Sequence, residues 1–412
     1  MSQHSLWPWL GLLTAAGLLS QATVHLVRPA TTYKLIGLGA DGLTVGLVSG
    51  AYALLPLIFA LWIGCRAQRA PDLRALLSGG SVVVVVGSGV LAWGQSISAT
   101  VLGSAVLGLG QLVFMVAAQA AVARFSAPHQ MDMSFGWFTA GLSGGQLIGP
   151  LIGGVLVGES VVGAESGLSG ADQALWVGGL LSLLSIVFIQ FIRVGSRGFG
   201  ASHGGGRSVG PLKEKGASDT DEPTVRRILA RRGMKSHLFA SVAMLAILDI
   251  LSAFMPLFGE ETGISPLWVG ILLSARAAAS IVSRLFLPLL RRRWSREALV
   301  LVGLWVSAVA LGLVPLSGSS VGLVLALFVW AGFFLGMGQP LTMSLVAQGV
   351  PESWQSSALA LRLMGNRVGQ VVIPVSAGGL AALFGSAGAM WGGVGLLIAS
   401  GVEKLVVYRR RS

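Results

Sequence analysis

The sequence has little charge: only 11% of its residues are Asp, Glu, Lys or Arg. A soluble domain carries about a quarter of such residues, so the composition excludes an ordinary soluble enzyme. The single cysteine, Cys65, excludes an internal disulfide. We find no cluster of metal-ligating residues, no phosphate-binding loop and no nucleophile triad. We therefore expect no cofactor, no bound metal and no enzymatic activity.

Apolar residues and glycine are abundant instead. Hydrophobic residues make up 54% of the chain, which also has 59 glycines, a residue that lets membrane helices pack closely. A helix needs about 20 apolar residues to cross a hydrocarbon core of about 30 Å. The sequence has twelve such segments, which predict an all-α membrane protein of about twelve transmembrane helices: 7–27, 43–64, 75–95, 98–123, 133–157, 173–192, 237–258, 265–290, 298–316, 321–345, 355–383 and 386–407. The first should be retained, since no Lys or Arg precedes it and it has no clear cleavage site.

The basic residues predict an orientation. An even number of spans puts both termini on one side, and 22 of the 28 Lys and Arg residues lie in segments on that side. Cytoplasmic loops are rich in Lys and Arg, so both termini should be cytoplasmic in a bacterial-type inner membrane. Lys34 falls on the outer side, as does Arg28, whose head group is expected to reach the interface. This distribution explains the net charge of +12 without nucleic acid as a partner.

The longest polar stretch, 194–236, predicts a flexible cytoplasmic linker between two six-helix halves, 1–193 and 237–412. The halves also resemble one another in sequence. Residues 108–115 (GLGQLVFM) match 336–343 (GMGQPLTM) at an offset of 228, and 43–47 match 267–271 at 224. A Gly-Gln pair followed by proline, at 145–150, recurs at 369–374. This parallel repeat is typical of transporters that hold their substrate between the halves, near the midplane.

One glycine pattern stands out in the fifth segment, GLSGGQLIGPLIGG at 141–154. Successive fourth positions share a face of a helix, so these glycines leave one face bare, and Pro150 adds a bend. The pattern consists of Gly141, Gly145, Gly149, Pro150, Gly153 and Gly154. With the twelve spans, the repeat and the central loop, essentially the whole chain resembles the major facilitator superfamily. The pattern itself resembles the motif of its drug:proton antiporters, which implies export driven by proton entry.

The loop after the second span departs from the superfamily pattern G-x-x-x-D-R-x-G-R-[KR]. Gly64 and Arg69 match, whereas Gln68 replaces the aspartate. The corresponding loop of the second half keeps a basic set, Arg284, Arg291, Arg292 and Arg293. In the superfamily this loop latches the halves together by charge pairing, so we expect Gln68 to weaken the latch. The arginine of the drug antiporters in the fourth span is also missing.

Charged groups inside spans are costly, so each is a functional hypothesis. Asp249 is the only acidic residue deep in a predicted span, and it lies at the depth of Arg276 and Arg367. We expect Asp249 to couple transport to protons, with His25 as the second candidate. The predicted wall of the substrate cavity comprises Gln111, Gln119, Gln146, Arg276, Gln339, Arg362, Asn366, Arg367 and Gln370. A structural ion-pair network within the second half is the alternative.

These features predict a monomeric secondary transporter that works by alternating access. The exported species would be a small amphipathic drug or an organic-anion metabolite, because arginines outnumber acids in the predicted cavity. A proton-coupled importer of an organic acid or sugar is the alternative, and a sensor without transport activity is a third reading.

Reporter fusions test the topology. A fusion after Gly205 should report the cytoplasmic side and a fusion after Gly263 the opposite side, because the charge distribution places the first in the linker and the second in an outer turn. The same side for both fusions would contradict the span assignment.

Overall fold

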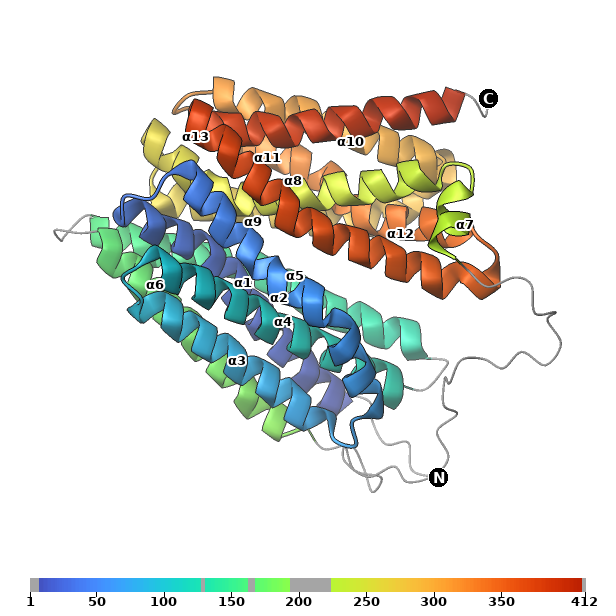
Figure 1. Ribbon diagram of the computed structural model, residues 1–412, viewed down its shortest axis with the longest axis horizontal. Helices are drawn as coiled ribbons and strands as arrows, with labels where there is room; N and C mark the ends of the chain where they lie inside the picture. The colour runs from blue at the N-terminus through green and yellow to red at the C-terminus, as the bar shows by residue number, and fades with distance from the viewer. Residues whose placement is uncertain (1–6, 127–129, 162–166, 193–223, 410–412) are drawn as a thin grey trace.

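The computed structural model describes residues 7–126, 130–161, 167–192 and 224–409, and within these segments the chain is helical with no strand (Figure 1). The first half consists of α1 (Trp7–Gly37), α2 (Gly42–Arg69), α3 (Leu73–Trp93), α4 (Ile97–Phe125), α5 (Met131–Val161) and α6 (Gly167–Gln190). The short α7 (Val225–Ala230) leads to the second half: α8 (Met234–Thr262), α9 (Pro266–Arg293), α10 (Arg296–Leu313), α11 (Val321–Gly336), α12 (Gly338–Gln348) and α13 (Gln355–Arg409). Single-turn helices Val314–Leu316 and Glu352–Trp354 follow α10 and precede α13.

The last two spans are joined in α13. Its 55 residues include a break at Phe384 and Gly385, where Gly385 has a φ of 69° that only glycine adopts readily. Glu261 at the end of α8 fixes this bend, because its carboxylate accepts hydrogen bonds from the backbone N–H and the hydroxyl of Ser386. Since α11 and α12 form one span, the described chain has twelve apolar crossings. The predicted number of spans and the predicted break between 383 and 386 are confirmed.

The helices form two bundles, α1–α6 and α8–α13, which lie side by side and diverge towards one end (Figure 1). Corresponding helices begin 224 residues apart: α2 and α9 at 42 and 266, α4 and α11 at 97 and 321, α5 and α13 at 131 and 355. This confirms the parallel repeat. The sequence match at an offset of 228 is therefore displaced by four residues, about one helical turn, from the structural equivalence.

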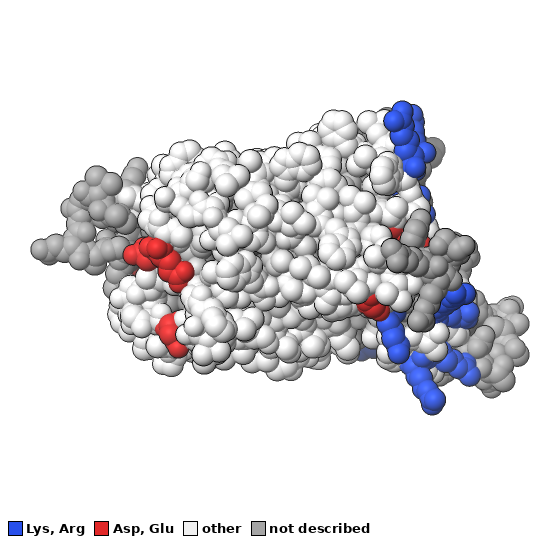
Figure 2. All heavy atoms as spheres, turned by 90° about the horizontal axis from the view of Figure 1, so that it is seen from above, with Lys and Arg blue, Asp and Glu red and all other residues white. Residues whose placement is uncertain are grey.

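The two ends of the molecule differ in charge. We call the basic end the one where α2 finishes with Arg66 and Arg69 and α9 with three further arginines. The acidic end holds the α1–α2 and α8–α9 turns, next to Asp41 and Glu260. On the visible face, Figure 2 shows Lys and Arg gathered at the basic end and Asp and Glu, without Lys or Arg, at the acidic end. The bundles diverge towards the basic end (Figure 1).

Two backbone contacts join the halves near the acidic end. A Cβ added to Gly154 of α5 would lie 2.7 Å from the oxygen of Pro266 and 3.1 Å from the Cα of Gly270, both on α9. On the other side, a Cβ on Gly378 of α13 would lie 2.9 Å from the Cα of Gly46 on α2. Gly46 and Gly270 are 224 residues apart, as are Gly154 and Gly378, so the repeat forms the same contact twice.

The remaining glycines of the 141–154 pattern pack within the first half. Gly141 faces Thr14 of α1, and Gly145 faces the backbone of Leu18 and Ala22. Side chains at these positions would push α1 away from α5. The glycines that face α1 therefore fix its position, whereas Gly154 and the carbonyl of Pro150 contact α9 of the second half.

Lys34 lies inside a helix rather than in a loop after the first predicted span. Helix α1 continues to Gly37, and Lys34 is fully buried within it. Its Nζ lies 2.7 Å from Oδ1 of Asp172 on α6 and donates to the carbonyl of Ala92 at 2.7 Å. A buried charge is stable when it is paired and hydrogen-bonded, so the lysine does not need an aqueous loop.

The end of the predicted linker is a packed helix rather than a flexible segment. Ile228 of α7 is buried in a cluster with Met234, Val346 and Trp354. Residues 194–223 lie outside the described residues, so the flexibility expected there stays a prediction.

Adjacent glycines of α13 test the contact at the acidic end. A Cβ at Gly378 would collide with α2, whereas a Cβ at Gly379 meets nothing within 4 Å. Overpacking costs about 1–3 kcal/mol, so Gly378→Leu should force the acidic end apart and Gly379→Leu should not. Spin labels on Leu38→Cys and Leu383→Cys, in a Cys65→Ser background, should report a longer distance for Gly378→Leu. An unchanged distance for that variant would contradict the assignment.

Candidate functional site

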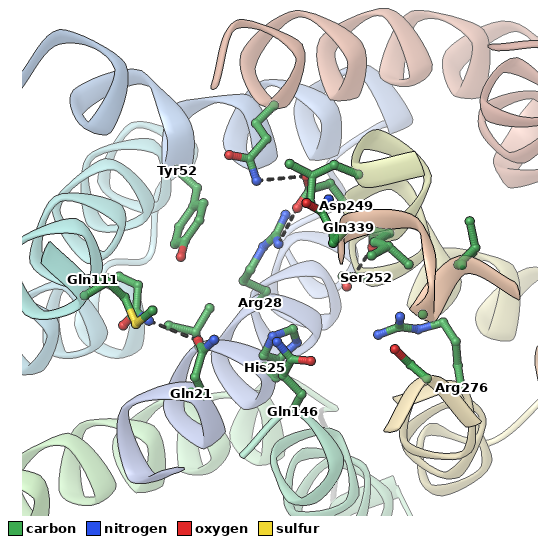
Figure 3. Close-up of a pocket in the computed structure, with 18 of the residues that line it drawn as sticks. Gln21, His25, Arg28, Tyr52, Gln111, Gln146, Asp249, Ser252, Arg276 and Gln339 are labelled. Carbon is green, nitrogen blue, oxygen red and sulfur yellow. Dashed lines mark hydrogen bonds and ion pairs between the residues drawn. The ribbon is translucent and has the colours of Figure 1, made fainter. Parts of the chain in front are cut away.

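A cavity of about 280 Å³ lies between the two bundles, lined by both halves (Figure 3). It is at the small end of ligand-site volumes, which run from roughly 300 to 1,000 Å³. The apolar lining comes from Val24, Met115, Leu245, Leu248 and Leu335. The polar lining comprises Gln21, His25, Arg28, Tyr52, Gln111, Gln146, Asp249, Ser252, Arg276, Ser280, Arg284, Gln339, Arg367 and Gln370. Such a lining suits a small molecule with apolar and polar parts.

An ion pair crosses the cavity from one half to the other. Nη1 of Arg28 on α1 lies 2.7 Å from Oδ1 of Asp249 on α8, and the two side chains are 13% and 6% exposed. The guanidinium of Arg28 also lies over the ring of Tyr52, 4.9 Å from its centroid, where the π face attracts the cation. Arg28 therefore belongs to the cavity, and its expected position at the membrane interface is wrong.

The second oxygen of Asp249 is also occupied. Gln370 donates from Nε2 to Oδ2 of Asp249 at 3.1 Å, and its Oε1 accepts from Nη1 of Arg367 at 3.0 Å. The sequence places Arg276 and Arg367 at the same depth as Asp249. The structure pairs Asp249 with Arg28 instead, with Arg367 connected only through the amide of Gln370.

The polar positions of the cavity follow the repeat. His25 and Asp249 are 224 residues apart, as are Tyr52 and Arg276, and Gln146 and Gln370. Packing supports the second equivalence. Gly108 approaches the backbone of Tyr52, and Gly332, 224 residues later, approaches the backbone of Arg276. The same positions thus build both sides of the cavity, with different residues on each.

Amide side chains form a network on the α1–α4 side. The hydroxyl of Ser20 donates to Oε1 of Gln111 at 2.9 Å, and Nε2 of Gln111 donates to Oε1 of Gln21 at 3.0 Å. These bonds fix which end of Gln111 acts as donor. On the other side, Oε1 of Gln339 accepts from Arg362 at 2.5 Å, while its Nε2 is buried without a hydrogen-bond partner. That nitrogen is a hydrogen-bond donor without a partner.

The structure brings most of the predicted site residues into one cavity: His25, Gln111, Gln146, Asp249, Arg276, Gln339, Arg367 and Gln370. Three predicted cavity residues lie elsewhere. Gln119 is exposed outside the cavity, Asn366 accepts a hydrogen bond from Ser241 of α8, and Arg362 reaches the cavity only through Gln339. Of Arg362, Asn366 and Gln370, only Gln370 lines the cavity.

The residues of the two loop motifs serve different contacts. Gly64 has open space around it and Arg69 is exposed. Arg124 of α4 donates to the carbonyls of Ala67, Gln68 and Ala70, which ties this loop within the first half.

In the second half, Arg284 crosses between the halves. It donates to Oγ of Ser143 on α5 at 3.2 Å and to the carbonyl of Gly336 at 3.3 Å. At the end of α9, Arg291 donates to the carbonyl of Trp294, and Arg292 and Arg293 are exposed.

The sequence reasoning missed Arg28, Tyr52 and Gln21. A signal was available for the first, because the 224-residue offset carries the deep position of Asp249 onto His25, one turn before Arg28. A deep His25 requires the first span to continue beyond Arg28.

The ion pair can be tested by stability. Removing one member of a buried pair costs about 3–5 kcal/mol, because the other charge stays uncompensated. Arg28→Gln and Asp249→Asn should each destabilise the protein by this order, and the double variant by less than their sum. Unfolding in detergent micelles measures these differences. Strict additivity would show that the pair contributes little.

Sequence comparisons place the chain in a family. The sequence model described as Major Facilitator Superfamily matches residues 12–258 and 237–412. Quinolone resistance protein NorA of Staphylococcus aureus is 27% identical over 133 residues, a match that spans 32% of this chain and 34% of NorA. The match thus covers about a third of that relative's length.

Solved structures show the same fold. A mutant of the nucleoside transporter NupG aligns with a TM-score of 0.76 at 14% identity, covering 97% of this chain and all of that one. A bacterial homologue of the human lysosomal transporter Spinster aligns with a TM-score of 0.74 at 14% identity, covering 99% of this chain and 96% of that one. With the twelve spans, the repeat and the family match, the chain belongs to the major facilitator superfamily.

Proposed function

We propose that this transporter exports a small amphipathic molecule in exchange for protons. The observation that carries the proposal is the ion pair between Arg28 and Asp249, which joins the two halves across a polar cavity. The basic end is cytoplasmic in this proposal, in keeping with the distribution of Lys and Arg. The protein acts as a monomer in the inner membrane.

In the proposed cycle the ion pair holds the acidic end closed while the halves diverge at the cytoplasmic end. A substrate that enters the cavity from the cytoplasm weakens the bond between Arg28 and Asp249. The halves then separate at the acidic end, and Asp249 takes up a proton from outside. A proton and Arg28 compete for the carboxylate of Asp249, so the empty carrier returns with Asp249 neutral and unpaired. Loss of the proton to the cytoplasm then restores the pair.

Two observations support export. The glycine pattern at 141–154 resembles the motif of drug:proton antiporters, and the relative NorA is named for quinolone resistance. Import of an organic acid is the second candidate, because a cavity lined by several arginines suits anions moving in either direction.

Asp249→Asn tests the coupling. In inverted vesicles with an acidic interior, the unmodified protein should accumulate members of a panel of quinolones and aromatic carboxylates. Asp249→Asn should abolish accumulation driven by the pH gradient and keep exchange of labelled for unlabelled substrate, because asparagine cannot gain or lose a proton.

Asp41→Asn is the matched control. Asp41 is an exposed helix cap at the acidic end, and asparagine caps equally well, so this variant should transport normally. Gradient-driven accumulation by Asp249→Asn would refute the coupling role. Accumulation only in right-side-out vesicles with acid outside would replace export with import.

A further inference from the structure

Arg276 is a buried cation without an ion-pair partner among the described residues. It lies on α9, is 6% exposed and lines the cavity. Its Nε has no hydrogen-bond partner, and it forms no ion pair with any described residue. Arg28, at the same cavity, has a carboxylate and an aromatic ring as partners. An unpaired charge removed from water is unfavourable. An anion from outside the chain would therefore stabilise Arg276.

The repeat explains why no acid is present there. Asp249 sits among groups of the C-terminal half and pairs with Arg28 across the interface. Its counterpart, His25, carries no negative charge. Figure 3 shows Arg276 pointing into the cavity on the side of His25 and Gln146, whereas Asp249 lies by Arg28. One side of the cavity thus holds the ion-paired acid. On the other side Arg276 interacts with Asp249 and Arg284 only through space, without a direct ion pair.

Helix packing holds Arg276 in place. A Cβ on Gly332 of α11 would lie 2.9 Å from the Cα of Arg276, so the two helices are in close backbone contact at this residue. Arg276 also follows ten residues after the start of α9, near the middle of its 28 residues. Its side chain cannot reach water at a helix end and instead presents its guanidinium to the cavity.

Asp249 is not available as the site for a cationic substrate. Its Oδ1 is held by Arg28 and its Oδ2 by Gln370. The other arginines of the cavity, Arg284 and Arg367, have only neutral partners among the described residues. The accessible charge of the cavity is therefore positive.

We propose that this cavity selects organic anions and that Arg276 is the residue that binds their carboxylate. A guanidinium matches a carboxylate with two parallel hydrogen bonds. The unsatisfied Nε2 of Gln339 adds a donor for a polar substituent, and the apolar body lies against Val24, Met115 and Leu248. This proposal names the substrate class of the exporter proposed above. Transport of such anions rests on that proposed function, whereas their binding does not.

Binding to the purified full-length protein tests this class. The probes are two matched series, on benzene and on naphthalene rings, each comprising the carboxylate, the carboxamide and the aminomethyl compound. Thermal unfolding in detergent measures the shift in Tm and the apparent Kd. The carboxylates should raise Tm and the amides and amines should not. In Arg276→Gln the apparent Kd for the carboxylate should rise roughly 10- to 100-fold, because this is the loss in affinity expected when a hydrogen bond to a charged group is removed.

Two further variants separate binding from folding. Arg66→Gln removes an exposed arginine at the basic end, outside the cavity, and should leave carboxylate binding unchanged. Without ligand, Arg276→Gln should be at least as stable as the unmodified protein, because it loses an uncompensated charge. Arg276→Lys keeps the charge without the fork and should bind carboxylates with intermediate affinity.

Three results would overturn the proposal. They are stabilisation by the amines rather than the carboxylates, carboxylate binding that survives Arg276→Gln, and no carboxylate-dependent shift in either series. A strong loss of ligand-free stability in Arg276→Gln would make the arginine structural. No gradient is present in this assay, so its failure leaves proton-driven export standing, and failure of Asp249→Asn in vesicles leaves the anion preference standing.

Discussion

The ion pair between Arg28 and Asp249 constrains the rest of the molecule. Burying two charges is costly unless they are paired and their remaining polar atoms are bonded. That requirement fixes the distance between α1 and α8, places Tyr52 over the guanidinium and orients Gln370 towards the second carboxylate oxygen. The glycine face of α5 lets α1 pack closely against its own half. In this position Arg28 of α1 contacts Asp249 in the other half. A shift of either helix would break several of these bonds together.

The repeat gives both halves the same helix contacts, whereas the side chains that line the cavity differ between the halves. The close backbone contacts at Gly46 with Gly378 and at Gly154 with Gly270 are the same on both sides. The side chains at the cavity differ between the halves, because His25 is equivalent to Asp249 and Tyr52 is equivalent to Arg276. A symmetric frame can open and close about the cavity, whereas an asymmetric lining can treat a proton and a substrate differently.

Much of the fold could be predicted because spans and repeats are local signals. Apolar length found twelve crossings, including the two joined in α13, and the repeat separated the halves. The length of α1 was missed for a physical reason: hydropathy ends a span at a charge, and only tertiary structure shows that Asp249 and Asp172 neutralise Arg28 and Lys34. Arg362, Asn366 and Gln370 recur at every fourth position and so share one face of a helix, but this spacing does not tell which neighbouring helix each residue contacts. The depth of Asp249 was visible in the sequence, and its partner was not.

The two buried ion pairs of the described residues join positions that are far apart in the chain, 138 residues for Lys34 with Asp172 and 221 for Arg28 with Asp249. A ribosome delivers α1 long before it delivers either acid. During synthesis Lys34 has no carboxylate partner until α6 is made, and Arg28 has none until α8 of the second half is made. The first half on its own therefore carries an unsatisfied cation at membrane depth, and it reaches its final state only when α8 docks against it. Two halves made as separate polypeptides should associate, because Arg28 in one half and Asp249 in the other each lack a partner until the halves meet.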